Sequence, residues 1–223
     1  PAVLLGLTAT PERHDGKNIL RHFDNRPDGT PAIQLRLWHA LDLQLLAPFE
    51  YYGCDDGEDY REINWSKPNL AQEQLSNLLT GNQMRARTII NNWRNLVADT
   101  RQCKALAFCV SVEHAEFMTE QFNQAGISAR LVTGQTNQNE RNAVPRQLQN
   151  GEINVIVTVD LYNEGIDLPF VDTLLLLRPT QSATVFQQQI GRGLRLYEGK
   201  ESCLVLDFVG QYQDGFRFDT LYS

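Results

Sequence analysis

From residue 104 onward, short apolar runs alternate with amphipathic stretches, and this alternation restricts the fold more than any other feature. The first run, residues 104–110 (KALAFCV), is apolar almost throughout, as in a parallel strand covered on both faces. Further strands are predicted over residues 127–132, 153–159, 173–177 and 203–208. Strands that alternate with helices predict an α/β fold, with a parallel sheet covered by helices on both faces.

The stretches between these strands carry helix signals. Ser111 is placed to cap a helix over residues 112–124, which Gly126 ends. Thr136 or Asn137 opens the next helix. Because ligands of parallel sheets bind at the carboxyl ends of the strands, we expect the binding residues of this chain to lie at that edge.

The part of the chain before residue 104 is less regular. Residues 35–49 show helical spacing of apolar side chains, and residues 49–53 (FEYYG) predict a strand. The acidic run 54–59 (CDDGED) predicts a solvated turn, since it lacks the alternating ligands of a calcium loop. Two amphipathic helices are predicted over residues 69–80 and 84–97.

Composition narrows the class of protein. The chain has 223 residues, 42% of them hydrophobic, and no apolar run approaches the roughly 20 residues that span a bilayer, so we predict no membrane helix. It opens PAVLLGLTAT, without a starting Met or a basic leader, which predicts an internal piece of a longer protein. Four cysteines without a CxxC pair disfavour zinc and predict a cytoplasmic location.

Charge is unevenly distributed. The net charge of −7 disfavours a surface that grips nucleic acid everywhere, because phosphate binding depends on Lys and Arg. Residues 178–200, however, contain four basic side chains and only Glu198 as an acid. A local basic cleft is therefore compatible with an acidic chain.

The stretch 184–195 (TVFQQQIGRGLR) contains part of this basic cluster. Read as a helix from about residue 183, it places Gln188 and Arg192 on one face. Gly191 and Gly193 flank Arg192, and each glycine costs a helix interior about 1 kcal/mol relative to alanine. Two glycines here indicate close backbone approach to a ligand, or, as the alternative, a frayed helix end with solvated arginines.

Three motifs resemble those of one family. The QxxGRxxR pattern of the last motif of superfamily 2 helicases and translocases is matched by Gln188, Gly191, Arg192 and Arg195. Residues 157–169 (VTVDLYNEGIDLP) resemble the preceding motif. Residues 6–13 (GLTATPER) resemble the Ser/Thr-Ala-Thr motif, in a form that occurs in repair helicases and restriction-enzyme motor subunits. The resemblance covers nearly the whole chain.

The resemblance implies an organisation in three parts. Residues 1–30 would be the end of a first RecA-like lobe, and residues 31–100 a hinge with packing helices. Residues 101–223 would be the RecA-like C-terminal lobe. The crossing between the lobes would fall between about residues 29 and 59.

It also implies roles at the nucleotide. Arg192 and Arg195 would contact the γ-phosphate of ATP, and Gln188 would link them to the nucleotide side. Gly165 and Asp167 match positions that approach ATP and its ribose.

The same resemblance assigns contacts with nucleic acid. These would come from Thr158, Ser111, Thr133, Gly134 and Thr136, since hydroxyls and amides at strand ends and helix starts bind phosphates without reading sequence. For each of them a helix-capping or strand-ending role is the alternative. Coupling between the lobes would involve Thr8, Ala9 and Thr10.

Two expected elements do not occur in the sequence. There is no GxxxxGK[ST] phosphate loop and no acidic box for Mg²⁺. Both belong to the first lobe, which would precede residue 1. That lobe would supply most of the contacts to Mg²⁺. The chain alone is therefore expected not to hydrolyse ATP. Its partners would be that lobe and nucleic acid, DNA rather than RNA.

Two other functions stay open at this point. The first is a motor-like domain that binds nucleic acid or serves as a scaffold without hydrolysing ATP. The second is a sugar-nucleotide transferase, which shares the alternating pattern but has no need of QxxGRxxR.

Overall fold

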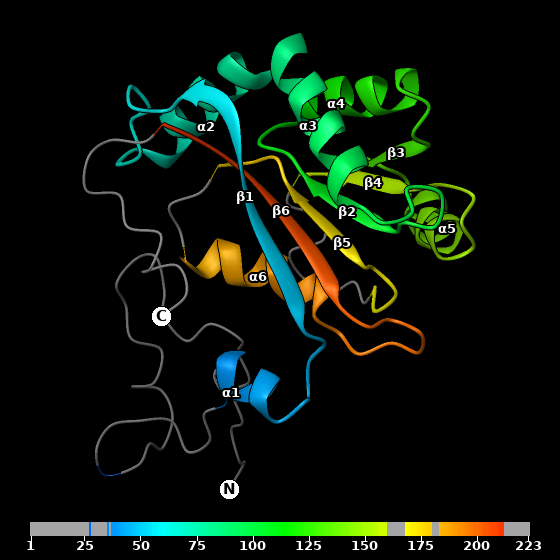
Figure 1. Cartoon of the computed structure of the whole chain (residues 1–223). Coiled ribbons are helices and arrows are strands. Elements are labelled where there is room, and N and C mark those ends of the chain that lie inside the picture. Colours follow the sequence, from blue (N-terminus) through cyan, green and yellow to red (C-terminus); the bar gives the residue numbers. More distant parts are fainter. Residues whose placement is uncertain (1–26, 28–34, 36, 160–167, 180–182, 212–223) are drawn as a thin grey trace, which may run out of the picture.

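A parallel sheet of six strands organises the computed structural model, which describes residues 27, 35, 37–159, 168–179 and 183–211 (Figure 1). The strands are β1 Phe49–Asp59, β2 Ala105–Phe108, β3 Ala129–Val132, β4 Val155–Thr158, β5 Thr173–Leu176 and β6 Cys203–Gln211. Their order is β1-β6-β5-β2-β4-β3, and every neighbouring pair is parallel. The predicted α/β fold is confirmed.

Helices cover both faces of this sheet, as the apolar strands predict (Figure 1). Successive residues of β2 point to opposite faces, so Ala107 packs beneath α3 (Gln83–Leu96) and α4 (Val112–Gln124). Leu106 and Phe108 pack on the other face, beneath α5 (Gln138–Gln149) and α6 (Ala183–Gly193). Two cores therefore hold the layers together.

The remaining helices lie toward the ends of the strands. The short helix α1 (Leu37–Asp42) precedes β1, and α2 (Pro68–Leu79) follows it. Helix α2 packs Leu75 and Leu79 against Tyr60 and Val110, in a third, smaller core at the carboxyl edge of the sheet. No helix in the described ranges is long and apolar enough to cross a membrane.

The structure differs from the sequence prediction in two places. The helix predicted over residues 35–49 ends at Asp42, and Leu43 and Leu45 beyond it are 53% and 54% exposed. The run 54–59 is not a solvated turn, because β1 continues through it beside β6 and buries Asp56.

Strand β1 and helices α2 and α3 pack on the same sheet as the later elements. The sheet thus begins well before residue 101. The division at residues 30 and 100 stays a prediction from the family resemblance.

Candidate nucleotide and nucleic-acid sites

Helix α6 carries the QxxGRxxR residues and packs one side on the sheet. Phe186, Ile190 and Leu194 are at most 1% exposed and lie in the core beside β5 and β6. Gln188 and Arg192, four residues apart, are only partly buried. Arg195, just past the end of the helix, is exposed. The predicted helix from about residue 183, with Gln188 and Arg192 on one side, is thus confirmed as far as Gly193.

The two glycines of α6 have different surroundings. A Cβ on Gly193 would overlap the sulfur of Cys203 and lie 2.9 Å from Cδ1 of Leu174, so only glycine lets the helix approach the sheet this closely. A Cβ on Gly191 would meet no atom of the described residues within 4 Å. Packing against the described residues therefore explains Gly193 but not Gly191.

The side chain of Lys200 binds the carboxyl end of α6. Its ammonium group donates hydrogen bonds to the carbonyl oxygens of Gly193, Arg195 and Pro169, at 2.5, 3.1 and 3.2 Å. The contacts to Gly193 and Arg195 satisfy carbonyls at the end of α6, and the contact to Pro169 ties this end to the segment before β5. Burial lowers the pKa of the Lys200 amine. Lys200 is thus a helix cap, and its ammonium group is already bound within the fold.

Ser111 caps α4 as predicted. Its hydroxyl accepts a hydrogen bond from the backbone N–H of His114 at 3.1 Å and shares another with the hydroxyl of Ser76 on α2, at 2.7 Å. Ser111 is 9% exposed and follows β2 at the carboxyl edge of the sheet.

The loop after β3 is also at this edge. Asn137 rather than Thr136 caps α5, by accepting from the N–H of Glu140 at 3.0 Å. The Thr136 hydroxyl accepts from the N–H of Thr133, and the Thr133 hydroxyl accepts from the N–H of Gln135. The loop is thus held by its own hydroxyls.

Arg141 adds a further constraint that sequence reasoning missed. Its guanidinium donates to the carbonyls of Gly134 and Thr136, at 2.9 and 3.1 Å, and so fixes the loop to helix α5. Gly134 is exposed, whereas Thr133 is 7% exposed. Gly134 is therefore the most accessible of the three loop residues predicted to contact nucleic acid.

Thr158 differs from its prediction. The sequence predicts a hydroxyl exposed at the end of β4, but the side chain is 0% exposed. Its hydroxyl makes no hydrogen bond with any of the described residues. Because β4 lies between β2 and β3 and is covered on both faces, its last residue is still inside the core. A contact of Thr158 with nucleic acid stays a prediction and needs this end of the strand to open.

The carboxyl edge also contains a buried ion pair. Arg85 on α3, 1% exposed, donates to the Asp56 carboxylate on β1 at 2.8 Å and to the carbonyl of Leu177 after β5 at 3.1 Å. The Tyr60 hydroxyl donates to the same carboxylate at 2.5 Å. The ring of His114 lies 3.5 Å from the guanidinium, and its pKa is lowered to about 3, first by burial and then by that positive charge. This cluster joins β1, α3, α4 and the exit of β5.

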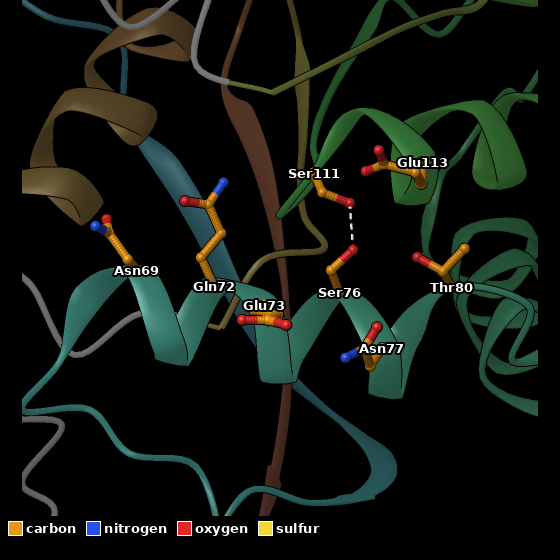
Figure 2. A pocket seen from close by; sticks show the side chains of 8 residues that line it. All are labelled: Asn69, Gln72, Glu73, Ser76, Asn77, Thr80, Ser111 and Glu113. Carbon is orange, nitrogen blue, oxygen red and sulfur yellow. Dashed lines mark hydrogen bonds between the residues drawn. The ribbon is translucent and has the colours of Figure 1, made fainter.

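A polar groove of about 560 Å³ opens between α2 and the start of α4 (Figure 2). Six residues of α2 and its end line one side, namely Asn69, Gln72, Glu73, Ser76, Asn77 and Thr80. Ser111 and Glu113 line the other side. Gln72 donates to the carbonyl of Val110 at 3.0 Å, so α2 is anchored directly to the end of β2.

The predicted residues fall into two groups. Helix α6 crosses one face of the sheet, and its last turn lies against Leu174 and Cys203, near the beginnings of β5 and β6. Leu194 at its end accepts a hydrogen bond from the N–H of Ala47, which precedes β1. Arg195 is thus near the amino ends of these strands, whereas Ser111 and Gly134 follow carboxyl ends. The predicted binding residues therefore do not all lie at the carboxyl edge, as the sequence led us to expect.

Five predicted residues lie outside the described part of the chain: Gly165, Asp167, Thr8, Ala9 and Thr10. Within the described residues, no group of His, Cys, Asp or Glu side chains is arranged to hold a metal ion.

A parallel sheet with this strand order, covered on both faces and followed from β5 by a QxxGRxxR helix, defines a RecA-like α/β lobe. Comparisons with known proteins agree with this class of fold. Residues 88–197 match the family model of the helicase conserved C-terminal domain. These residues thus belong to the helicase C-terminal domain family that superfamily 2 helicases share.

Relatives match over most of this chain. The candidate ATP-dependent helicase IRC3 of Saccharomyces cerevisiae is 27% identical over 207 residues, which cover 93% of this chain and 29% of IRC3. A 51.5 kDa protein of a Lactococcus phage is 31% identical over 206 residues, 92% of this chain and 43% of that protein. The chain thus spans less than half the length of these relatives.

A solved structure resembles nearly the whole fold. It is a fragment of a candidate HsdR subunit of a type I restriction enzyme from Vibrio vulnificus, with a TM-score of 0.68. The match covers 91% of this chain and 38% of the other, at 24% sequence identity. It supports the fold.

Proposed function

We propose that this chain is the second motor lobe of an ATP-dependent helicase or translocase that acts on nucleic acid. ATP would bind between this lobe and a first RecA-like lobe. Arg192 and Arg195 would contact the γ-phosphate, with Gln188 linking them to the nucleotide side. The outer side of α6 carries this proposal, because Gln188 and Arg192 are only partly buried there while the other side of the helix is packed on the sheet.

The chemistry follows from the residue types. Transfer of the γ-phosphoryl group spreads negative charge over its oxygens, and an arginine delivered from a second body raises the rate by roughly 10³ to 10⁵. A planar guanidinium fits phosphate oxygens better than an ammonium group does. Mg²⁺, held mainly by the first lobe, would neutralise charge on the phosphates. The role of this lobe would be to deliver and orient the two guanidinium groups.

Orientation depends on the contacts at the end of α6. Gly193 sets the distance of the helix from the sheet, and Lys200 fixes the carbonyl of Arg195. Together they limit where the Arg195 backbone can lie. A positioned group contributes more to catalysis than a mobile one, because less ordering is needed in the transition state.

Nucleic acid would bind at the carboxyl edge, with Ser111 and Gly134 as contacts to the phosphate backbone. Helix α6 has 11 residues and is therefore about 16 Å long. It runs between that edge and the nucleotide side, so closure around ATP would move both sites as one body. DNA is favoured over RNA because the GLTATPER motif has the form that resembles repair helicases and restriction-enzyme motor subunits.

The experiment is an ATPase titration of the intact protein with single-stranded DNA, duplex DNA and RNA. The proposal predicts hydrolysis that rises with DNA and less with RNA. Binding of DNA without hydrolysis would instead support a silent binding module. Hydrolysis that no nucleic acid stimulates would contradict the proposed function.

A further inference from the structure

The groove between α2 and α4 combines features that suit a nucleobase. Its volume, about 560 Å³, falls in the range of small-ligand sites, roughly 300–1,000 Å³. All the side chains that line it are amides, hydroxyls or carboxylates. On α2 they recur every three or four residues, so they form one continuous polar wall facing Ser111 and Glu113 (Figure 2).

Along α2, away from Ser111, the groove offers no positive charge to a phosphate. None of the residues that line it is Lys or Arg, and Glu73 and Glu113 are both exposed carboxylates. Carboxylates accept hydrogen bonds from the exocyclic amino groups of bases, and amides pair with base edges. Single strands are read in this way, by hydrogen bonds to the edges of unstacked bases.

The groove also lies next to Ser111, one of the predicted contacts with the nucleic-acid backbone. It begins at Ser111, where the proposed function puts a backbone phosphate, and base and sugar extend from such a phosphate. Within the described part of the chain, the side chains of Asn69 and Asn77 make no hydrogen bond and are exposed. Their amides are therefore available without breaking a contact of the fold.

We propose that this groove holds bases of the bound single strand, with Asn69 and Asn77, about 12 Å apart along α2, each as a contact to a base edge, and with Glu73 and Glu113 favouring bases that carry an amino group. The inference rests on the proposed function, since it needs a strand at Ser111. It adds a base preference to a site that otherwise contacts only the backbone. Adenine and cytosine strands would bind better than thymine strands.

The test combines protein variants with base removal. Fluorescence anisotropy of the intact protein is measured with short single strands of oligoadenylate, oligothymidylate and an abasic strand of equal length. The wild type should bind oligoadenylate at least about fivefold more tightly than the abasic strand. The Asn69→Ala/Asn77→Ala variant should lose this ratio while its affinity for the abasic strand is unchanged.

Folding is not at risk in this variant, because both positions are exposed on a helix and alanine favours helices. Asn91→Ala, an exposed position on α3 outside the groove, is the matched control and should keep the wild-type ratio. Ser111→Ala should weaken all strands equally.

The outcomes separate the two proposals. If strands bind but the asparagine variant keeps the wild-type ratio, the groove proposal is overturned and the proposed function stands. If the wild type binds the abasic strand as tightly as oligoadenylate, the groove proposal again fails alone. If no strand binds, both are overturned.

Discussion

The buried ion pair between Arg85 and Asp56 gives the sharpest test of how the carboxyl edge is held together. Replacing Arg85 by Met keeps much of the side-chain volume but leaves the Asp56 carboxylate buried without its cation. Removing one partner of a buried pair costs about 3–5 kcal/mol, because an uncompensated charge remains. Against a total stability of about 5–15 kcal/mol, this is a large fraction.

Urea unfolding at pH 7 measures the loss. The reporter is tryptophan fluorescence, with Trp93 on α3 fully buried against Phe122 at a ring distance of 5.5 Å. A loss of about 4 kcal/mol with a slope of about 2 kcal/mol per M lowers the midpoint by about 2 M. The matched control is Arg61→Ala, which breaks the exposed Arg61–Asp59 pair. Because solvent screens that pair, its midpoint should hardly change.

A double variant tests whether the unpaired charge of Asp56 causes this loss of stability. Asp56→Asn/Arg85→Met removes both charges, and the new amide can still accept from the N–H of Glu58 through its oxygen and donate to the Tyr60 hydroxyl oxygen through its NH2 group. It should recover a large part of the stability lost in Arg85→Met. The reasoning is refuted if Arg85→Met costs no more than Arg61→Ala, or if the losses of the two single variants simply add.

Three further predictions concern α6 and the centre of the sheet. Gly193→Ala should destabilise the chain by about 1–3 kcal/mol because its methyl group overlaps the sheet, whereas Gly191→Ala should gain up to about 1 kcal/mol; equal thermal midpoints would contradict this. Lys200→Met should cost about 1–3 kcal/mol in urea through three lost contacts to carbonyl groups, and an unchanged midpoint would show that the cap is dispensable. Burial raises the pKa of Asp207 to about 6, so the folded chain holds a proton that the unfolded chain releases at about pH 4, and stability falls as pH rises between these values. The stability of Asp207→Asn relative to wild type should therefore increase from pH 4 to pH 7, and a constant difference would rule out this titration.

Local signals predicted much of this fold. The Ser111 cap and the helix over residues 112–124 agree with α4, because a capping hydroxyl and a closing glycine act within a few residues of the chain. The apolar run 104–110 contains β2 for the same reason. The end of α1 could not be predicted, since the leucines that follow it keep helical spacing but face solvent.

Long-range contacts account for what sequence reasoning missed. Asp56 lies in a run whose composition indicates a solvated turn, and its partner Arg85 is 29 residues away on another element. Only the pairing of β1 with β6 and the packing of α3 bring them together. Gly193 is similar, since the sequence marks it as unusual but cannot tell a close approach to the sheet from a close approach to a ligand.

The central proposal is that α6 supplies arginines to an ATP site shared with another lobe. Its most direct test is the DNA-stimulated ATPase rate of the intact protein carrying Arg195→Ala, compared with Arg87→Ala, an exposed arginine on α3. The account predicts a loss of roughly 10³-fold or more for Arg195→Ala, with folding and DNA binding retained, and a wild-type rate for the control. An unchanged rate in Arg195→Ala would contradict it.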